Sequence, residues 1–278
     1  MRYKNPHPRR RFQGGFTLIE LVMVIVILGV IGGMVAVFMR GPIDAYVDSS
    51  RRAALTDVAD TTVRRIARDL RKALPNSVRS PTTQCLEFIP TKTGGRYRAD
   101  DTATGLNFTA ADTSFNMLGG NAALPPDQRI ADQDVVVVYN LGIPGSSAYS
   151  QDNTAVVSSI GVETTVAPGT GMETPINIAS KLFPLASGGN RFHVVPGAER
   201  VVAYVCSAGN LHRTASNSFT PTSCLATGPI LARNISACSF DYTGSDLQRN
   251  ALVNMVLQLT DSGETVSLHH EVHVNNTP

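Results

Sequence analysis

The stretch from Gly14 to Met39, GGFTLIELVMVIVILGVIGGMVAVFM, determines how the rest of the chain is organised. Phe16 to Met39 is a run of 24 residues with one charged side chain, Glu20. As a helix this run is about 36 Å long, which is enough to cross a bilayer. No second stretch approaches this length, which excludes a membrane protein with several spans. The sequence therefore predicts one membrane-spanning helix near the N-terminus.

The residues that precede this run are basic. Residues 1–15 carry five Lys or Arg side chains and no acid, although the net charge of the whole chain is only +2. A basic flank on this side predicts a cytoplasmic N-terminus and an exported C-terminal body. A cleaved secretory signal peptide fits poorly, because the apolar run is too long and no small-x-small cleavage site follows it. A simple signal anchor leaves Glu20 without a partner, which costs about 2.5–3.5 kcal/mol inside a membrane.

The motif Gly14-Gly15-Phe16-Thr17-Leu18-Ile19-Glu20, followed by an apolar helix, resembles the class III signal of type IV pilins and type II secretion pseudopilins. The resemblance implies that a prepilin peptidase cuts after Gly15 and that Phe16, the new N-terminal residue, is N-methylated. It also implies that Glu20 pairs with the N-terminal amine of a neighbouring subunit. Such a pair supplies the partner that a charge in a low-dielectric span needs.

The same resemblance implies partners, locations and four parts of the chain. The partners are other pilins of the same system, the prepilin peptidase and the inner-membrane assembly platform. The chain is expected to cross the inner membrane once with its head in the periplasm, and to join a surface pilus once it is assembled. The parts are a basic leader that is removed (1–15), a transmembrane assembly helix (16–39), an amphipathic helix that continues into the head (40–75) and a β-rich globular head (76–278).

Residues 43–74 show the spacing of an amphipathic helix, with apolar side chains mostly three or four residues apart. The apolar stripe consists of Ile43, Val47, Ala54, Leu55, Val58, Val63, Ile66, Leu70 and Leu74. Pro75 is expected to end the helix, and Gly41-Pro42 to kink or locally melt it, because proline lacks the N–H that a helix needs. Acids lie among the basic residues around Arg64–Lys72, which favours a solvated helix face over a nucleic-acid or lipid patch.

The rest of the chain shows the alternation and turn residues of an antiparallel β structure. Eight strands are predicted: Cys85–Ile89, Asp134–Leu141, Arg191–Val195, Val201–Cys206, Ile230–Ile235, Ala237–Tyr242, Leu252–Thr260 and Thr265–Val274. Val135–Val138 suits a strand buried on both faces. Residues 142–180, rich in Gly, Ser, Thr, Asn and Pro, are expected to form long surface loops and not a second domain. The expected fold class is α+β: a long N-terminal helix packed on an antiparallel β-sheet head with long loops, as in pilins.

The four cysteines, Cys85, Cys206, Cys224 and Cys238, all follow the apolar run and are expected in an oxidising compartment. An even number there favours two disulfides, for which three connectivities are possible. We favour Cys85 with Cys206 and Cys224 with Cys238, because the second bridge closes a short loop. A zinc site is disfavoured, because the gaps between the cysteines do not fit a Cys-x2-Cys spacing.

Motifs of common enzymes are missing from the sequence, which has no Walker loop, no Gly-x-Ser-x-Gly and no His-Glu-x-x-His. His269, Glu271 and His273 alternate along the last strand, but no further ligand is visible, so a solvated strand face is favoured over a metal site. His270 falls on the opposite, apolar face and is interpreted as a core histidine. We therefore expect no enzymatic activity, no cofactor and no metal.

A finer resemblance extends over most of the chain. Six segments resemble minor pilins of the mannose-sensitive haemagglutinin (MSHA) pilus system: Arg68–Ser77, Leu86–Thr91, Gly94–Asp100, Asp112–Phe115, Ala237–Phe240 and Val272–Val274. This resemblance implies a minor pilin that takes part in initiating, assembling or capping a fibre. One alternative is a type II secretion pseudopilin, which works in a periplasmic piston. The other is a tip adhesin that binds a surface, sugar or DNA ligand through its head loops.

Overall fold

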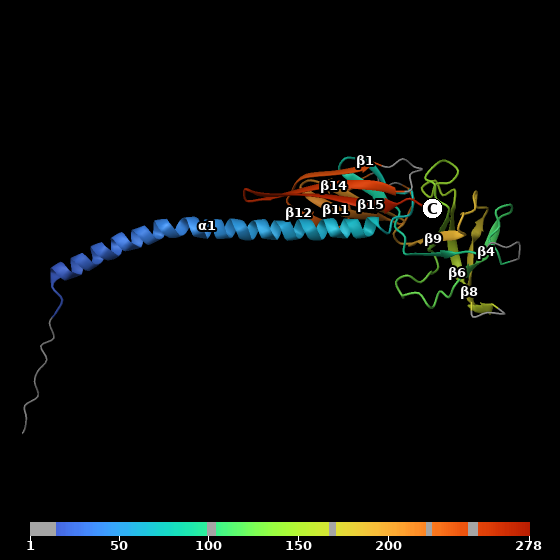
Figure 1. Ribbon diagram of the computed structural model, residues 1–278, viewed down its shortest axis with the longest axis horizontal. Coiled ribbons are helices and arrows are strands. Elements are labelled where there is room, and N and C mark those ends of the chain that lie inside the picture. The colour runs from blue at the N-terminus through green and yellow to red at the C-terminus, as the bar shows by residue number, and fades with distance from the viewer. Residues whose placement is uncertain (1–14, 99–103, 167–170, 221–223, 244–249) are drawn as a thin grey trace, which may run out of the picture. The chain divides into compact units, whose positions relative to one another are not determined.

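The computed structural model describes residues 15–98, 104–166, 171–220, 224–243 and 250–278. The chain forms two compact units, Met1–Arg51 and Arg52–Pro278. The first unit contains the N-terminal part of helix α1, Leu18–Leu70, and the second contains the rest of this helix and the strands β1 to β15 (Figure 1).

Helix α1 is continuous from Leu18 to Leu70. Pro42 lies inside it, so the predicted local melting at Gly41-Pro42 does not occur. Proline removes one hydrogen bond of the helical ladder, and the turns on either side keep the backbone helical. The helix also ends before the predicted Leu74, because the chain pairs here with another segment. Leu74 N donates to Ile89 O at 2.8 Å, and Thr91 N donates to Lys72 O at 2.8 Å.

The Arg52–Leu70 part of α1 buries one face against β-sheets. Its buried residues are Leu55, Ala59, Thr62, Val63, Ile66, Ala67 and Leu70. Four of them belong to the predicted stripe, whereas Ala54 and Val58 of that stripe are exposed. Ala59 and Ala67, which the predicted stripe leaves out, are buried instead, whereas Val58 is 41% exposed.

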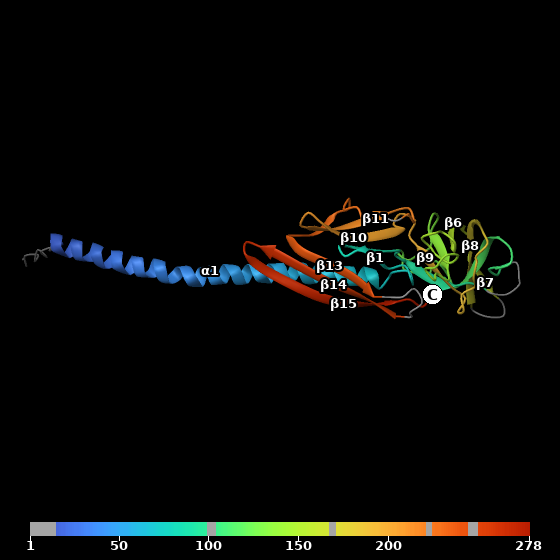
Figure 2. The same ribbon diagram turned by 90° about the horizontal axis from the view of Figure 1, so that it is seen from above.

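Two antiparallel sheets pack with this part of α1. The first has five strands in the order β1 (Arg79–Thr82), β2 (Cys85–Phe88), β10 (Val201–Ser207), β11 (Asn210–Ser216) and β12 (Ile230–Arg233). The second has three strands in the order β13 (Ile235–Thr243), β14 (Asn250–Asp261) and β15 (Glu264–Asn275). Figures 1 and 2 show β13, β14 and β15 running alongside the C-terminal part of α1. Apolar side chains of the helix and of both sheets form one core.

A third antiparallel sheet has a core of its own. Its strands follow the order β3 (Thr93–Arg96), β9 (Arg191–Val195), β5 (Val135–Val138), β6 (Thr154–Ile160), β8 (Gly171–Lys181) and β4 (Asp112–Leu118), and β7 (Thr164–Val166) pairs with β8. The four valines of β5 are buried, as predicted. Val136 and Val138 face the core of this sheet, whereas Val135 and Val137 face a smaller apolar cluster that includes Leu74 and connects the sheet to the rest of the head.

All eight predicted strands are present, but the prediction of surface loops over residues 142–180 is only partly right: residues 142–153 are mainly turns, whereas strands occupy much of the rest. This segment contains β6, β7 and β8, which belong to the third sheet. Because the segment is rich in polar residues, the alternation of buried and less buried positions cannot be recognised from its hydropathy. In β8 the buried Thr174, Ile176 and Ile178 alternate with Pro175 and Asn177. Threonine is a good strand former, so a segment rich in Thr and Ser can still form an interior strand.

The four cysteines form two disulfides, Cys85–Cys224 and Cys206–Cys238. The number of bridges is as predicted, but the favoured pairing of Cys85 with Cys206 and of Cys224 with Cys238 is wrong. Cys85 lies opposite Val205 in the pairing of β2 with β10, so Cys85 and Cys206 point to opposite faces of the sheet. Cys206 faces the core that Cys238 of β13 contacts, and Cys85 faces the cluster that contains Cys224.

Candidate assembly site

The first turn of α1 is capped by Thr17. The backbone N–H of Glu20 donates to Thr17 O at 3.1 Å and lies 3.3 Å from Thr17 Oγ1, and the N–H of Leu21 donates to Thr17 O at 3.1 Å. Thr17 is therefore the N-cap residue, which satisfies N–H groups that a helix start leaves free. This role of Thr17 was not predicted from the sequence, although the Thr17-x-x-Glu20 spacing is that of a capping box and indicates it.

Glu20 lies in this first turn with its side chain exposed. Negative charge is favoured at a helix N-terminus, because the helix dipole places partial positive charge there. In the part of the chain that the structure describes, no side chain forms an ion pair with the Glu20 carboxylate. The carboxylate is thus available to a cation of another molecule.

The helix around Glu20 exposes an unusually large apolar surface. Every large hydrophobic side chain from Phe16 to Met39 is between 46% and 86% exposed. By length and composition, α1 is able to cross a membrane. Apolar surface of this extent is unfavourable in water, so lipid or the apolar helices of other chains must cover it. The structure places Phe16 and Glu20, the two residues predicted to act in methylation and pairing, at the N-terminal end of this surface.

The other end of α1 is joined to the five-stranded sheet by a charged network around Asp69. The Asp69 carboxylate accepts from Tyr204 Oη at 2.6 Å and from Arg213 Nε at 3.3 Å, and Arg213 donates two further hydrogen bonds of 2.9 Å to Glu199. Hydrogen bonding to Arg213 holds the pKa of Glu199 below its usual range. Burial raises the pKa of Tyr204, so its hydroxyl stays protonated and donates. Directional contacts therefore add to the apolar packing of this helix end.

A second polar contact joins α1 to the last hairpin. Arg52 donates from Nε at 3.0 Å and from Nη2 at 2.7 Å to Oε2 of Glu264, where β15 begins after its turn with β14. Arg52 is exposed, so this ion pair contributes modestly to stability. The ion pair nevertheless joins the tip of the β14–β15 hairpin to the part of α1 where packing against the sheets begins.

The histidines of β15 lie where the alternation predicts. His269, Glu271 and His273 are exposed on one face of the strand, and His270 is half-buried on the face that also carries Val272. Among the described residues, no group of three or more His, Cys, Asp or Glu side chains is placed to hold a metal ion.

Comparison with known proteins identifies the N-terminal segment. Residues 10–36 match the prokaryotic N-terminal methylation motif. No curated protein and no solved structure matches the chain. The motif is typical of type IV pilins and pseudopilins, which are structural and not enzymatic proteins, and it implies processing by prepilin peptidase and assembly with other pilins. The apolar helix that carries it indicates a prepilin anchored in the inner membrane. With this motif on a long N-terminal helix whose second half packs against antiparallel sheets, the chain is a type IV pilin-like protein that assembles through its N-terminal helix.

Proposed function

We propose that this chain is a minor pilin of the MSHA type, similar to the minor pilin MshO, that takes part in initiating, assembling or capping a surface pilus. The observation that carries the proposal is the exposed apolar helix with a carboxylate in its first turn. Neighbouring helices of the same kind would cover that surface. The size of the head also favours a minor subunit over a major one, because three sheets make this head larger than that of a typical major pilin.

The proposed mechanism places one charge pair at each subunit contact. Prepilin peptidase cuts after Gly15, and Phe16 becomes the methylated N-terminal residue. The positive amine of Phe16 then pairs with Glu20 of a neighbouring subunit inside the apolar bundle. Removing one member of such a pair leaves the other uncompensated, which costs about 3–5 kcal/mol in a low-dielectric environment. The pair therefore determines the register of neighbouring helices, and apolar contacts supply the bulk of the affinity.

The proposal is tested by expressing Glu20→Ala in the full chain together with the other pilins of its locus. We expect the variant to insert in the membrane, and its crosslinks to other pilins and the fibre count to fall sharply, because the neighbouring amine loses its counter-charge. Asp57→Ala is the matched control, since it removes an exposed carboxylate from the same helix outside the apolar run. Crosslinking is normalised to the amount of each variant in the membrane. Normal assembly of Glu20→Ala would contradict the pairing mechanism.

Two further measurements separate the alternatives. Recovery of the chain in sheared surface fibres supports the pilus, whereas its absence there and a secretion defect on deletion of its gene support a type II secretion pseudopilin. A tip adhesin is supported if a variant of the head keeps a normal fibre count and loses attachment to a surface.

A further inference from the structure

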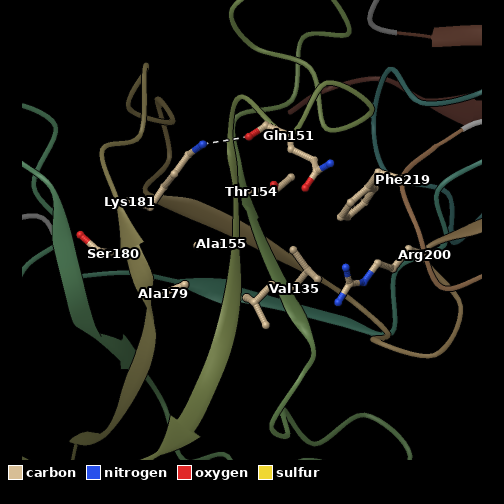
Figure 3. Close-up of a pocket in the computed structure, with 10 residues that line it drawn as sticks. Val135, Gln151, Thr154, Ala155, Ala179, Ser180, Lys181, Arg200 and Phe219 are labelled. Carbon is tan, nitrogen blue, oxygen red and sulfur yellow. Dashed lines mark hydrogen bonds between the residues drawn. The ribbon is translucent and has the colours of Figure 1, made fainter.

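A cavity of about 190 Å³ lies in the head, outside the assembly site. Its apolar wall is formed by Val135, Ala155, Val156, Ala179 and Phe219. Its polar lining is formed by Gln151, Thr154, Ser180, Lys181 and Arg200. Figure 3 shows Arg200 and Phe219 on one side of the cavity and Ala179, Ser180 and Lys181 of β8 on the other.

The charge of this lining is positive. Lys181 and Arg200 contribute two cationic groups, and no carboxylate lines the cavity. Within the described ranges, neither of the two forms an ion pair, and Lys181 Nζ donates only to the backbone O of Gln151, at 2.8 Å (Figure 3). Lys181 is one of only two basic residues between Ala99 and Asn190, a segment with nine acids. The cavity is therefore a local cationic site in an otherwise acidic part of the chain.

The side chain of Arg200 has a buried N–H group that needs a hydrogen-bond acceptor. Its Nε atom is buried and has no hydrogen-bond partner among the residues that the structure describes. A buried donor without an acceptor costs about 1–3 kcal/mol, so a ligand that supplies one is favoured. The guanidinium group lies 5.7 Å from the centre of the Phe219 ring. A planar guanidinium beside an apolar wall is suited to a carboxylate, which it can bind through two parallel hydrogen bonds.

Gln151 adopts a backbone conformation that has an energetic cost. Its φ angle is +60°, in the left-handed region that disfavours residues other than glycine, asparagine and aspartate. This conformation directs the carbonyl of Gln151 to Lys181 while the residue lines the cavity. Strained residues of this kind are common where a ligand binds.

We propose that this cavity binds one acidic monosaccharide unit. The carboxylate would pair with Arg200, the C–H face of the ring would lie on the apolar wall, and hydroxyl groups would bond to Thr154 and Gln151. The volume is below the roughly 300–1,000 Å³ of sites for drug-sized molecules, which limits the ligand to a single ring. The apolar wall favours a sugar acid over a bare inorganic anion. This site shares no residue with the assembly helix, so the inference goes beyond the proposed function.

The test is equilibrium dialysis of the mature full-length chain, in a non-ionic detergent, against radiolabelled D-glucuronate. Unlabelled D-glucose and inorganic sulfate serve as competitors. Binding of glucuronate is expected to weaken at least tenfold in Arg200→Gln and several-fold in Lys181→Gln. Arg233→Gln is the matched control, because Arg233 is exposed and lies outside the cavity, and its affinity should equal that of the wild type. Glucose should compete poorly because it has no charge, and sulfate because it has no ring.

Three results would overturn the proposal: no glucuronate binding by the wild type, unchanged affinity in Arg200→Gln, or competition by sulfate as strong as that by glucuronate. Denaturant midpoints of all variants are measured alongside. If Arg200→Gln unfolds, Arg200→Lys takes its place, which keeps the charge and loses the two-pronged hydrogen bonding, and it should bind several-fold more weakly. Fibre counts of Arg200→Gln should equal those of the wild type, so failure of this proposal is distinguishable from failure of the assembly function.

Discussion

Tyr204 of β10 donates its hydroxyl to the carboxylate of Asp69 at 2.6 Å, although the two residues are 135 positions apart in the sequence. Asp69 belongs to the last turn of α1, and Tyr204 lies in the core that the helix and the sheets share. Arg213 of the neighbouring strand donates to the same carboxylate. A polar contact inside an apolar interface therefore determines how the end of the helix is rotated against the sheet.

Tyr204→Phe should destabilise the head while keeping its packing. The variant retains the ring beside Phe88, with 6.3 Å between the ring centres, and removes only the hydroxyl. We expect the free energy of unfolding to fall by about 1–2 kcal/mol, because Asp69 loses a hydrogen bond to a charged acceptor. Denaturant titration of the full chain in detergent measures this change. Tyr46→Phe, at an exposed position of α1, is the control, and equal midpoints for Tyr204→Phe and wild type would contradict the prediction.

The stability of the head should fall in mild acid because of His193 in β9. Burial, with a smaller contribution from Arg191, lowers the pKa of His193 from 6.5 to about 4, and its Nε2 has no partner among the described residues. In the folded state His193 is difficult to protonate, whereas in the unfolded state it takes up a proton near its ordinary pKa. The free energy of unfolding is therefore highest above pH 6.5 and falls as the pH drops from 6.5 to about 4, by at most about 3 kcal/mol.

Denaturant midpoints at pH 7 and pH 4.5 test this dependence. His193→Leu should lose less stability between the two pH values than the wild type does, because it has no group to protonate. The control is His269→Gln, which changes an exposed histidine of β15 and should behave as the wild type. Identical pH dependence in His193→Leu and wild type would show that other groups cause the loss.

Peptide mapping of the mature chain without reduction should recover Cys85 linked to Cys224 and Cys206 linked to Cys238. A sample that is reduced, denatured and reoxidised is the control, and it should show mixed pairs. Replacing Cys206 and Cys238 by serine should lower the free energy of unfolding by about 2–5 kcal/mol. A peptide in which Cys85 is linked to Cys206 would contradict the register of β2 and β10.

Gly15→Glu should prevent removal of the leader. A Cβ atom at Gly15 meets nothing within 4 Å, so the substitution does not disturb the described fold and would act on recognition by the peptidase. Mass spectrometry of membranes should find the leader intact in this variant, and a chain that begins with methylated Phe16 in the wild type. Gly171→Glu is the matched control, because Gly171 also has open space around it and lies in the head. An intact leader in the wild type, with active peptidase present, would contradict cleavage after Gly15.

Local patterns predict much of this fold. The apolar run defines α1, and regular alternation defines the hairpin of β14 and β15 and the buried valines of β5. Residues 142–180 were harder to predict, because their polar composition resembles that of loops. Only the pairing of β8 with β4, β6 and β7 distinguishes them from loops. Disulfide connectivity depends on which face of β10 each cysteine occupies, which requires the register with β2. The cavity assembles residues from Val135 to Phe219, and no local spacing indicates that they meet.

The bridge between Cys85 and Cys224 also determines how the chain responds to mechanical tension. It joins residues 139 positions apart, so a pulling force applied between the helix and the C-terminal hairpin passes across the sulfur atoms and bypasses the intervening chain. At about 3.4 Å per extended residue, about 470 Å of polypeptide is withheld from stretching. The whole third sheet and every residue that lines the cavity lie inside this loop. Under such tension the chain would therefore lengthen elsewhere while the cavity kept its shape.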